Sequence, residues 1–183
     1  MKITRWTVLA VATVLMVGCF KPPVFKVSGE TPQSPVLKPY SHLYVGWVAL
    51  PEDDWKKYGF VTKEDWVAKI RIFNTTGLQA YIRDRLRDAQ VSGPEAQEQG
   101  LPVEGDLYIK FTFHSLSGQN EPFELNLGVE FIDLATRETV YRTDVGVDSY
   151  GVRNRGVKQM YFYGQLDNAM YNLAYFINER LRG

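Results

Sequence analysis

Between positions 107 and 147 the sequence alternates apolar and polar residues over three stretches, and this pattern limits the possible folds more than any other. The stretches run from Leu107 to His114, from Leu125 to Phe131 and from Thr139 to Val147. Successive side chains of a strand point to opposite faces of a sheet, so each stretch predicts a half-buried strand. Turn-forming residues from Asp133 to Glu138 separate the last two. We therefore expect an antiparallel meander of three strands.

Two helices are predicted, one before and one after these strands. From about Val157 to Leu181, apolar residues recur every three or four positions, which is the spacing of one buried helix face. These residues are Phe162, Leu166, Met170, Leu173, Ile177 and Leu181. The earlier helix is expected from about Lys63 to Ala89, with Thr62 as its N-terminal cap.

The middle of the earlier helix has two interpretations. Asn74-Thr75-Thr76-Gly77 is a point where a long helix can break in two. Alternatively, Val67 to Phe73 forms a strand and Thr76 caps a shorter helix. The sequence leaves both interpretations open.

The remaining segments complete a two-layer arrangement. His42 to Leu50 is mostly apolar and predicts a buried strand, whereas Val91 to Gly105 is rich in glycine, proline and glutamate and predicts a surface loop. A strand, a helix, three strands and a final helix imply an α+β fold. We expect a two-layer sandwich, in which an antiparallel meander sheet packs against a long helix from the N-terminal half and a C-terminal helix.

The first twenty residues have the features of an export signal. Lys2 and Arg5 form a short basic region, and Trp6 to Val17 follows without a charge. Even when extended to Phe20, the apolar stretch holds about fifteen residues, whereas a helix that crosses the hydrocarbon core needs about twenty. The stretch is therefore too short for a permanent span.

The end of this signal, Met16-Val17-Gly18-Cys19, resembles the lipobox of bacterial lipoproteins, although methionine stands where that family usually has leucine. In that family a thioether links the cysteine to diacylglycerol, the signal is cut off before the cysteine, and the new N-terminus is acylated. The resemblance implies cleavage between Gly18 and Cys19 and lipid, such as palmitate, on Cys19. The alternatives are a lone cysteine buried as a small apolar side chain, or an uncleaved anchor helix ending at Phe20.

On this interpretation the chain has three parts. Residues 1–18 are the lipoprotein signal peptide, residues 19–40 a proline-rich tether, and residues 41–183 a single α+β domain. Because Cys19 is the only cysteine, the domain has no disulfide and no thiolate metal site. No aspartate follows Cys19, which by the same resemblance favours the outer membrane, with the domain facing the periplasm.

The stretch from Phe131 to Tyr141 carries a second resemblance. Its apolar pair, aspartate, then threonine and glutamate before an aromatic residue are similar to a hairpin of periplasmic lipoproteins such as the curli-secretion subunit and penicillin-binding-protein activators. Arg137 stands where that hairpin usually has glycine. The resemblance implies an α+β fold and carries no function.

The sequence shows no catalytic, metal or cofactor motif. His42 and His114 are far apart and are expected in ordinary structural or surface roles. Glu52-Asp53-Asp54 is expected to be a solvated turn, since three consecutive acids do not converge on one cation. Basic and acidic residues number 21 each, which gives no electrostatic reason to expect nucleic acid as a partner. We expect no enzyme activity, no cofactor and no metal.

One stretch combines cations with aromatic side chains and is a candidate contact with a partner. Its residues are Tyr150, Arg153, Arg155, Lys158 and Tyr161. Such a cluster can bind a protein, a lipid headgroup or a glycan. The alternative is a solvated loop followed by aromatic residues of the core.

These observations predict a lipid-anchored, non-catalytic protein of the cell envelope. We expect its N-terminal lipid to hold it to a membrane and its domain to bind another envelope protein within an assembly. One alternative is a periplasmic binding module for a lipid, a glycan or a small ligand, and the other is a hydrolase without a recognised motif. The sequence carries no signal for the oligomeric state.

Overall fold

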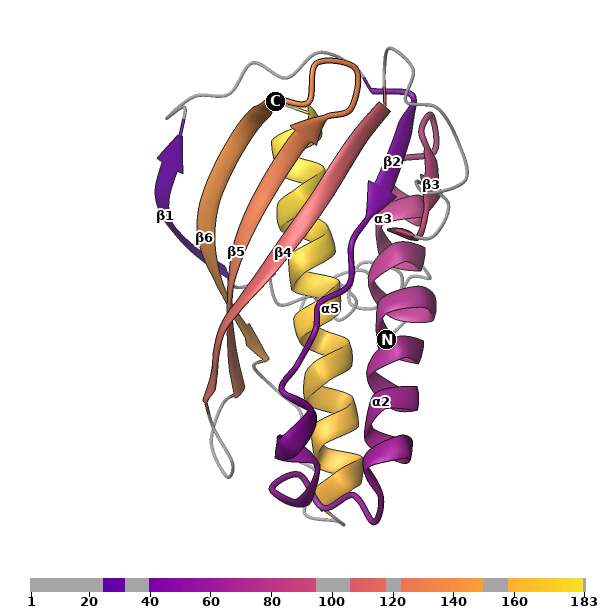
Figure 1. The fold of residues 1–183 in the computed structure, drawn as a ribbon, viewed down its shortest axis with the longest axis vertical. Coiled ribbons are helices and arrows are strands. Elements are labelled where there is room, and N and C mark those ends of the chain that lie inside the picture. Colours follow the sequence, from indigo (N-terminus) through magenta and orange to yellow (C-terminus); the bar gives the residue numbers. More distant parts are fainter. Residues whose placement is uncertain (1–24, 32–39, 95–105, 118–122, 150–157, 183) are drawn as a thin grey trace, which may run out of the picture.

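A computed structural model describes residues 25–31, 40–94, 106–117, 123–149 and 158–182. These residues form two layers, a sheet and a layer of helices against one of its faces (Figure 1). The α+β sandwich predicted from the sequence is confirmed. The expected export signal, with Gly18 and Cys19, lies outside the described residues.

The sheet has six strands in the order β1-β6-β5-β4-β2-β3. Their bounds are β1 Phe25–Thr31, β2 His42–Val45, β3 Gln90–Ser92, β4 Asp106–Ser117, β5 Phe123–Asp133 and β6 Thr139–Ser149. Strands β4, β5 and β6 pair as an antiparallel meander, as the alternating pattern predicts. Strand β1 adds to β6 antiparallel, whereas β2 pairs parallel with both β4 and β3.

The core lies between the sheet and helix α5, which spans Lys158–Arg182. The inward side chains of β5 and β6 are fully buried, and they include Leu125, Leu127, Val129, Phe131, Tyr141, Val145 and Val147. Of the stripe predicted on the C-terminal helix, five side chains are buried and Leu181 is partly buried against the core. Burial of this stripe stabilises both layers at once, at about 25 cal/mol per Å² of apolar surface.

The earlier helix is continuous, so the prediction that it could break at Asn74 and the alternative of a strand over Val67 to Phe73 are both wrong. Helix α2, Lys63–Ile72, runs into the π-helix η2, Phe73–Gln79, and then into α3, Ala80–Arg85. Thr62 caps the start, because its Oγ1 accepts from Asp65 N at 3.1 Å. The helix ends at Arg85 rather than Ala89.

The polar residues of η2 explain why the helix widens instead of breaking. The hydroxyl of Thr75 donates to Arg71 O at 3.1 Å, and that of Thr76 to Ile72 O at 2.9 Å. These side chains use carbonyls one turn earlier, and such bonds distort the regular α-helical ladder. The residues that look like breakers in the sequence therefore satisfy the backbone of a local π-helix.

Three further boundaries differ from the sequence predictions. The tether predicted over residues 19–40 contains β1, so the folded domain includes Phe25–Thr31. The loop predicted over Val91 to Gly105 begins inside β3. The strand predicted from His42 to Leu50 ends at Val45, after which the chain is extended up to the 3₁₀ helix η1, Glu52–Lys56.

The turn between β5 and β6 follows the predicted hairpin. Asp133 Oδ1 accepts from Ala135 N at 2.9 Å and Thr136 N at 3.2 Å, which is the turn chemistry of aspartate. Arg137 adopts a φ of 61° there, a left-handed conformation that glycine adopts more easily. The arginine that replaces the usual glycine thus lies where the backbone favours glycine.

Within the described ranges, no helix has the length and apolar character needed to cross a bilayer.

Candidate functional site

An apolar cleft opens between the extended chain after β2 and helix α2. It has a volume of about 330 Å³. Its lining is Trp47, Val48, Ala49, Leu50, Glu52, Trp66, Val67, Ile70, Arg71 and Asn74. Val67 is 43% exposed, so part of this apolar lining faces solvent. An exposed apolar hollow with charged residues at its rim is a typical binding surface.

A buried asparagine holds the two walls of this cleft together. Asn74 Oδ1 accepts from Val48 N at 2.8 Å, and Asn74 Nδ2 donates to Val48 O at 3.2 Å. The same amide nitrogen donates to Ile70 O at 2.9 Å. The side chain therefore pairs with the extended chain as a neighbouring strand would, where β2 has ended. Trp66 adds a second link, since its Nε1 donates to Pro51 O at 3.1 Å.

The two charged residues of the cleft lie on opposite walls. The guanidinium of Arg71 lies over the Trp47 ring, 5.8 Å from its centroid, which is a cation–π contact. Glu52 pairs with Lys63, with 2.5 Å between the carboxylate oxygen and Nζ. The expected solvated turn at Glu52-Asp53-Asp54 is a 3₁₀ helix in which Asp54 also pairs with a lysine, Lys57, at 3.8 Å.

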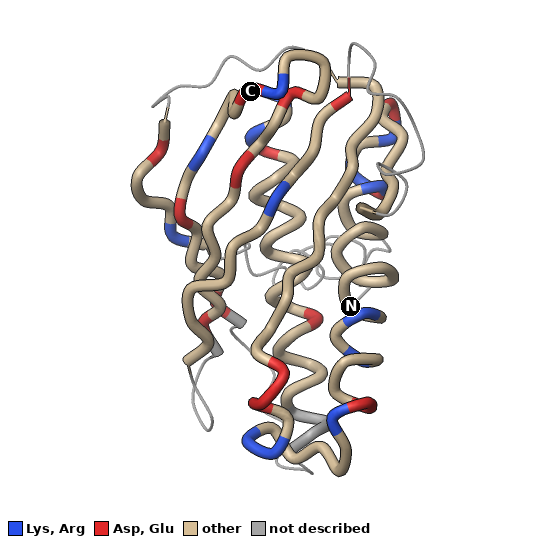
Figure 2. Tube along the Cα trace, in the orientation of Figure 1, with Lys and Arg blue, Asp and Glu red and all other residues tan. Residues whose placement is uncertain are grey.

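The face of the sheet that the helices do not cover is polar and carries both positive and negative charges. Figure 2 shows basic and acidic residues interspersed along β1, β4, β5 and β6. Glu130 lies between two cations, Lys110 Nζ at 3.1 Å and the guanidinium of Arg142. Burial alone would raise the pKa of the Glu130 carboxyl, but its bonds with these cations and their charges lower it below the usual value.

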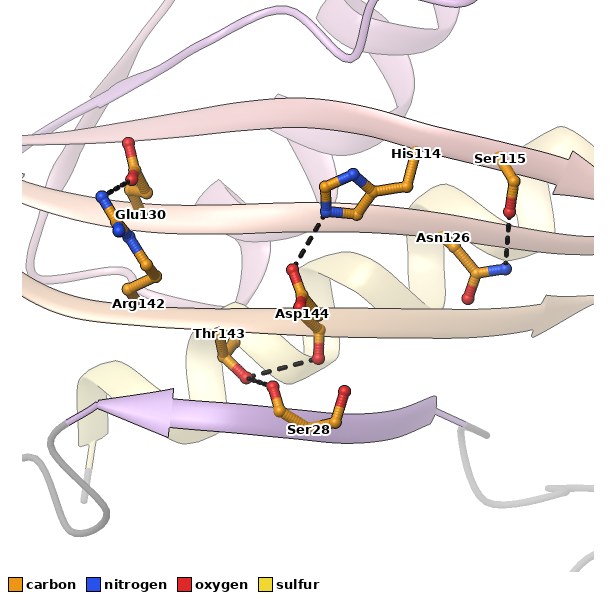
Figure 3. A network of polar contacts seen from close by, with 8 residues as sticks. All are labelled: Ser28, His114, Ser115, Asn126, Glu130, Arg142, Thr143 and Asp144. Carbon is orange, nitrogen blue, oxygen red and sulfur yellow. Dashed lines mark hydrogen bonds and ion pairs between the residues drawn. The ribbon is translucent and has the colours of Figure 1, made fainter.

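His114 and Asp144 contact each other across this face, although their strands are separated by β5 (Figure 3). His114 Nε2 lies 3.0 Å from Asp144 Oδ1. Gly128 of β5 lies beneath the ring, where a Cβ would come within 3.0 Å of Nε2. A residue with a side chain at position 128 would crowd the imidazole, so the glycine permits the close approach.

A hydroxyl also contacts this pair, since Thr143 Oγ1 donates to the backbone oxygen of Asp144 at 3.3 Å and to Ser28 O at 2.8 Å (Figure 3). Ser115, the residue after His114, accepts a hydrogen bond from Asn126 Nδ2 at 3.0 Å (Figure 3). His42 is on another strand, where its Nε2 lies 2.9 Å from Ser92 Oγ and its ring stacks on Tyr44 at 4.1 Å between centroids. Both histidines thus have polar partners on the sheet.

The partner-contact residues predicted from the sequence lie wholly or partly outside the described structure. Tyr150, Arg153 and Arg155 lie outside the described residues. Lys158 and Tyr161 belong to the first turns of α5, and their side chains also lie outside the description. This patch stays a prediction.

Sequence reasoning missed the apolar cleft, but one signal for it was present. Asn74 lies four residues after Ile70 and four before Leu78, so it interrupts the apolar stripe of the helix with an amide. Such a residue on the buried face needs hydrogen-bond partners from another segment. The sequence does not say which segment supplies them, and the structure identifies Val48.

No protein-family model matches the sequence, and no curated protein matches it either. Two solved structures of PelC dodecamers from Paraburkholderia phytofirmans are similar in structure, with 12% and 13% identity and TM-scores of 0.40 and 0.42. Each match covers 82% of this chain and 97% of the PelC chain. A protein described as a neuraminyllactose-binding hemagglutinin homolog from Helicobacter pylori has 11% identity and a TM-score of 0.37, over 79% of this chain and 88% of that one. At these values the likeness carries no conclusion about function.

Proposed function

We propose that this chain is a lipid-anchored, non-catalytic protein of the bacterial cell envelope whose domain binds another envelope protein through the apolar cleft. The lipid is attached to Cys19, and the domain faces the periplasm from the outer membrane. The lipobox resemblance supports the anchor, and the cleft supports the binding role.

The observation that carries the binding role is the combination of an apolar lining with rigid walls. Asn74 fixes the distance between the walls through two hydrogen bonds with Val48, so little conformational entropy is lost when the cleft is filled. Filling it removes Val67 and the half-buried Trp47 from water, which is favourable by about 25 cal/mol per Å². An aliphatic or aromatic side chain of the partner fits this lining, with polar neighbours facing Arg71 and Glu52.

The position of β1 determines how far from the bilayer a lipid on Cys19 would hold the domain. Only residues 20–24 separate Cys19 from Phe25, the first residue of β1. A fully extended chain spans about 3.3–3.6 Å per residue, so this connection reaches about 20 Å. With lipid on Cys19, the domain would be held next to the bilayer rather than at the end of a long tether.

The anchor is tested by radiolabelled palmitate incorporation in the wild type and in Cys19→Ala. We expect label in the wild type alone, together with a wild-type N-terminus that begins at Cys19. An unlabelled wild-type protein, or one that retains residues 1–18, contradicts the anchor. This result leaves the binding role untouched, because the cleft does not depend on lipid.

The binding role is tested by placing a photocrosslinking amino acid at Ala49, which is exposed at the cleft, in the full-length chain in cells. We expect one specific crosslinked envelope protein. Val67→Asp should remove this band, because a carboxylate would have to be desolvated in the cleft. Val61→Asp is the matched control, since Val61 is 80% exposed and lies outside the lining. A band that survives Val67→Asp contradicts the role of the cleft.

The alternative of a small-ligand module is favoured by one observation, the cleft volume. About 330 Å³ lies at the lower end of the range for small-molecule pockets, about 300–1,000 Å³. Extraction of the purified protein with organic solvent, followed by mass spectrometry, distinguishes the two functions. A stoichiometric apolar compound that is lost in Val67→Asp would support the small-ligand function, in place of protein binding.

A further inference from the structure

A second cleft lies at the opposite end of the helix layer, between the end of α3 and the last turns of α5. Its volume is about 470 Å³, and its lining is Arg85, Tyr175, Asn178, Glu179, Arg180 and Arg182. We call it the arginine cleft. Three of its six lining residues are arginines, which sets it apart from the apolar cleft.

Two of the three arginines have no carboxylate partner within the described part of the chain. Arg180 pairs with Glu30 of β1 at 2.6 Å, so its charge is balanced. Arg85 and Arg182 take part in no described ion pair, and the carboxylate of Glu179 is occupied by a hydrogen bond with Tyr175. The cleft therefore has a surplus of positive charge close to its lining.

The unpaired guanidinium groups are held in place. Arg85 lies over two rings of α5, 4.9 Å from the Tyr171 centroid and 4.8 Å from the Tyr175 centroid. Its terminal nitrogen also donates to the Tyr171 hydroxyl at 2.5 Å. Arg182 donates to the backbone carbonyl of Arg85, which links the end of α5 to the end of α3. Fixed donors of this kind are ready to bind an anion with little further ordering.

The state of Asn178 indicates a ligand rather than a charged surface. Asn178 lines the arginine cleft and is only 5% exposed, and neither its amide oxygen nor its amide nitrogen has a hydrogen-bond partner among the described residues. Leaving a buried polar group unpaired costs about 1–3 kcal/mol. The other buried asparagine of α5, Asn172, donates to Asp148 O at 2.6 Å and to Asn168 Oδ1 at 3.1 Å. The fold thus satisfies one buried amide and leaves the other unpaired at the cleft.

We propose that the arginine cleft binds an acidic peptide segment, with a carboxylate on Arg85 and Arg182 and a peptide group on Asn178. A carboxylate matches the paired donors of a guanidinium. The amide of Asn178 offers both a donor and an acceptor, so it needs a partner that accepts and donates, as a peptide group does. A doubly ionised phosphate ester offers acceptors alone and would leave Asn178 Oδ1 without a donor. This site is independent of the anchor and of the apolar cleft.

Fluorescence anisotropy of the full chain, solubilised in detergent micelles, tests the proposal. The probe is a labelled hexapeptide of alternating glycine and aspartate, acetylated and amidated at its ends. The comparison peptide has asparagine in place of aspartate, and inorganic phosphate serves as competitor. We expect the aspartate peptide to bind at least tenfold more tightly than the asparagine peptide, and phosphate to compete weakly.

Three variants distinguish specific binding at the cleft from a general effect of positive charge and from a loss of folding. Arg182→Gln should weaken binding about tenfold or more, because a charge-assisted hydrogen bond is lost. Arg87→Gln is the matched control, since Arg87 is exposed and lies outside the lining. Asn178→Ala should weaken binding without lowering the midpoint of unfolding, because the amide it removes has no partner in the free protein.

Each result bears on the proposal. Selective binding of the aspartate peptide, lost in Arg182→Gln and Asn178→Ala and kept in Arg87→Gln, supports it. Failure of the aspartate peptide to bind overturns it, as do equal losses in Arg182→Gln and Arg87→Gln. The proposal is also overturned, in favour of a phosphate site, if phosphate displaces the labelled peptide at a lower concentration than the unlabelled aspartate peptide does.

Discussion

The hydroxyl of Tyr141 donates a hydrogen bond to Glu30 Oε1 at 2.6 Å, and this contact ties the N-terminal strand β1 to the fully buried part of β6. Arg180 of α5 completes the cluster, with its Nε donating to the Tyr141 hydroxyl at 3.1 Å. A single buried hydroxyl thus connects the edge of the sheet, its interior and the helix layer.

Removing the Tyr141 hydroxyl should destabilise the domain, whereas removing the buried hydroxyl of Tyr58 should not. We expect Tyr141→Phe to lower the free energy of unfolding by about 1–2 kcal/mol, because two hydrogen bonds to charged groups are lost. Tyr58 is the matched control, since its hydroxyl is buried without a hydrogen-bond partner in the described ranges. Tyr58→Phe should leave stability unchanged or raise it. Urea unfolding measures both, and equal losses would contradict the role of the cluster.

The same tyrosine predicts how stability changes in alkali. Burial, together with the hydrogen bond to Glu30, raises the pKa of Tyr141 from 10.0 to about 12. The folded state therefore keeps the phenol proton at a pH where the unfolded state has lost it. The contribution is complete below pH 10 and disappears as pH rises towards about 12. Urea unfolding between about pH 8 and 11.5 should show a weaker alkaline decline for Tyr141→Phe than for the wild type. Identical declines would contradict the raised pKa.

Asn74 should be the most sensitive polar residue of the apolar cleft. Asn74→Ala leaves Val48 N and Val48 O without their side-chain partner, whereas Ile70 O keeps the bond from Phe73 N. We expect a loss of about 2–4 kcal/mol in unfolding free energy, since each buried unpaired group costs about 1–3 kcal/mol and water partly compensates. Asn126→Ala, which removes an exposed bond to Ser115, is the control and should cost about 0.5 kcal/mol or less. A small loss in Asn74→Ala would show that the cleft walls do not depend on this side chain.

The meander could be predicted from the sequence because the sheet buries one face and exposes the other. Leu125, Leu127 and Val129 are fully buried, while Asn126 and Glu130 between and after them lie on the polar face, so the alternation records the two environments. The helix stripe of α5 records burial in the same way, with a period of 3.6 residues. These elements can therefore be predicted from their own residues, without knowledge of their partners in the fold.

The missed elements depend on partners that are distant in the sequence. Strand β2 lies within the segment predicted as a strand, but its parallel pairing with β4 and β3 has no local signal, and β3 has three residues, too few to show a period. Strand β1 does alternate Phe25, Lys26, Val27 and Ser28, but it lies among prolines and is only half-buried. The arginine cleft joins Arg85 to Arg182, which no local pattern relates.

Gly46 and Gly128 should tolerate alanine differently, because an added Cβ would meet backbone at Gly46 and a side chain at Gly128. A Cβ at Gly46 would lie 2.8 Å from Ile109 O, the same carbonyl that accepts from Gly46 N at 2.8 Å. Gly46→Ala should therefore cost about 1–3 kcal/mol, because backbone has to move. At Gly128 the added Cβ meets the exposed ring of His114, which can swing away, so Gly128→Ala should cost about 0.5 kcal/mol or less. Urea unfolding of both variants checks the ranking, and the reverse order would contradict it.

Arg137 offers a stabilising change at the hairpin between β5 and β6. Its φ of 61° lies in the left-handed region, which costs an L-residue roughly 1–2 kcal/mol. The turn needs this conformation because Arg137 N donates to Asp133 O at 2.7 Å. Glycine adopts it without steric strain, although the unfolded chain gains conformational freedom, which reduces the benefit. We expect Arg137→Gly to raise the free energy of unfolding by about 0.5–1 kcal/mol, and Arg137→Val to lower it because a β-branched residue is crowded there. Thermal unfolding of the two variants tests this, and a loss of stability in Arg137→Gly would show that the arginine side chain contributes more than its backbone strain costs.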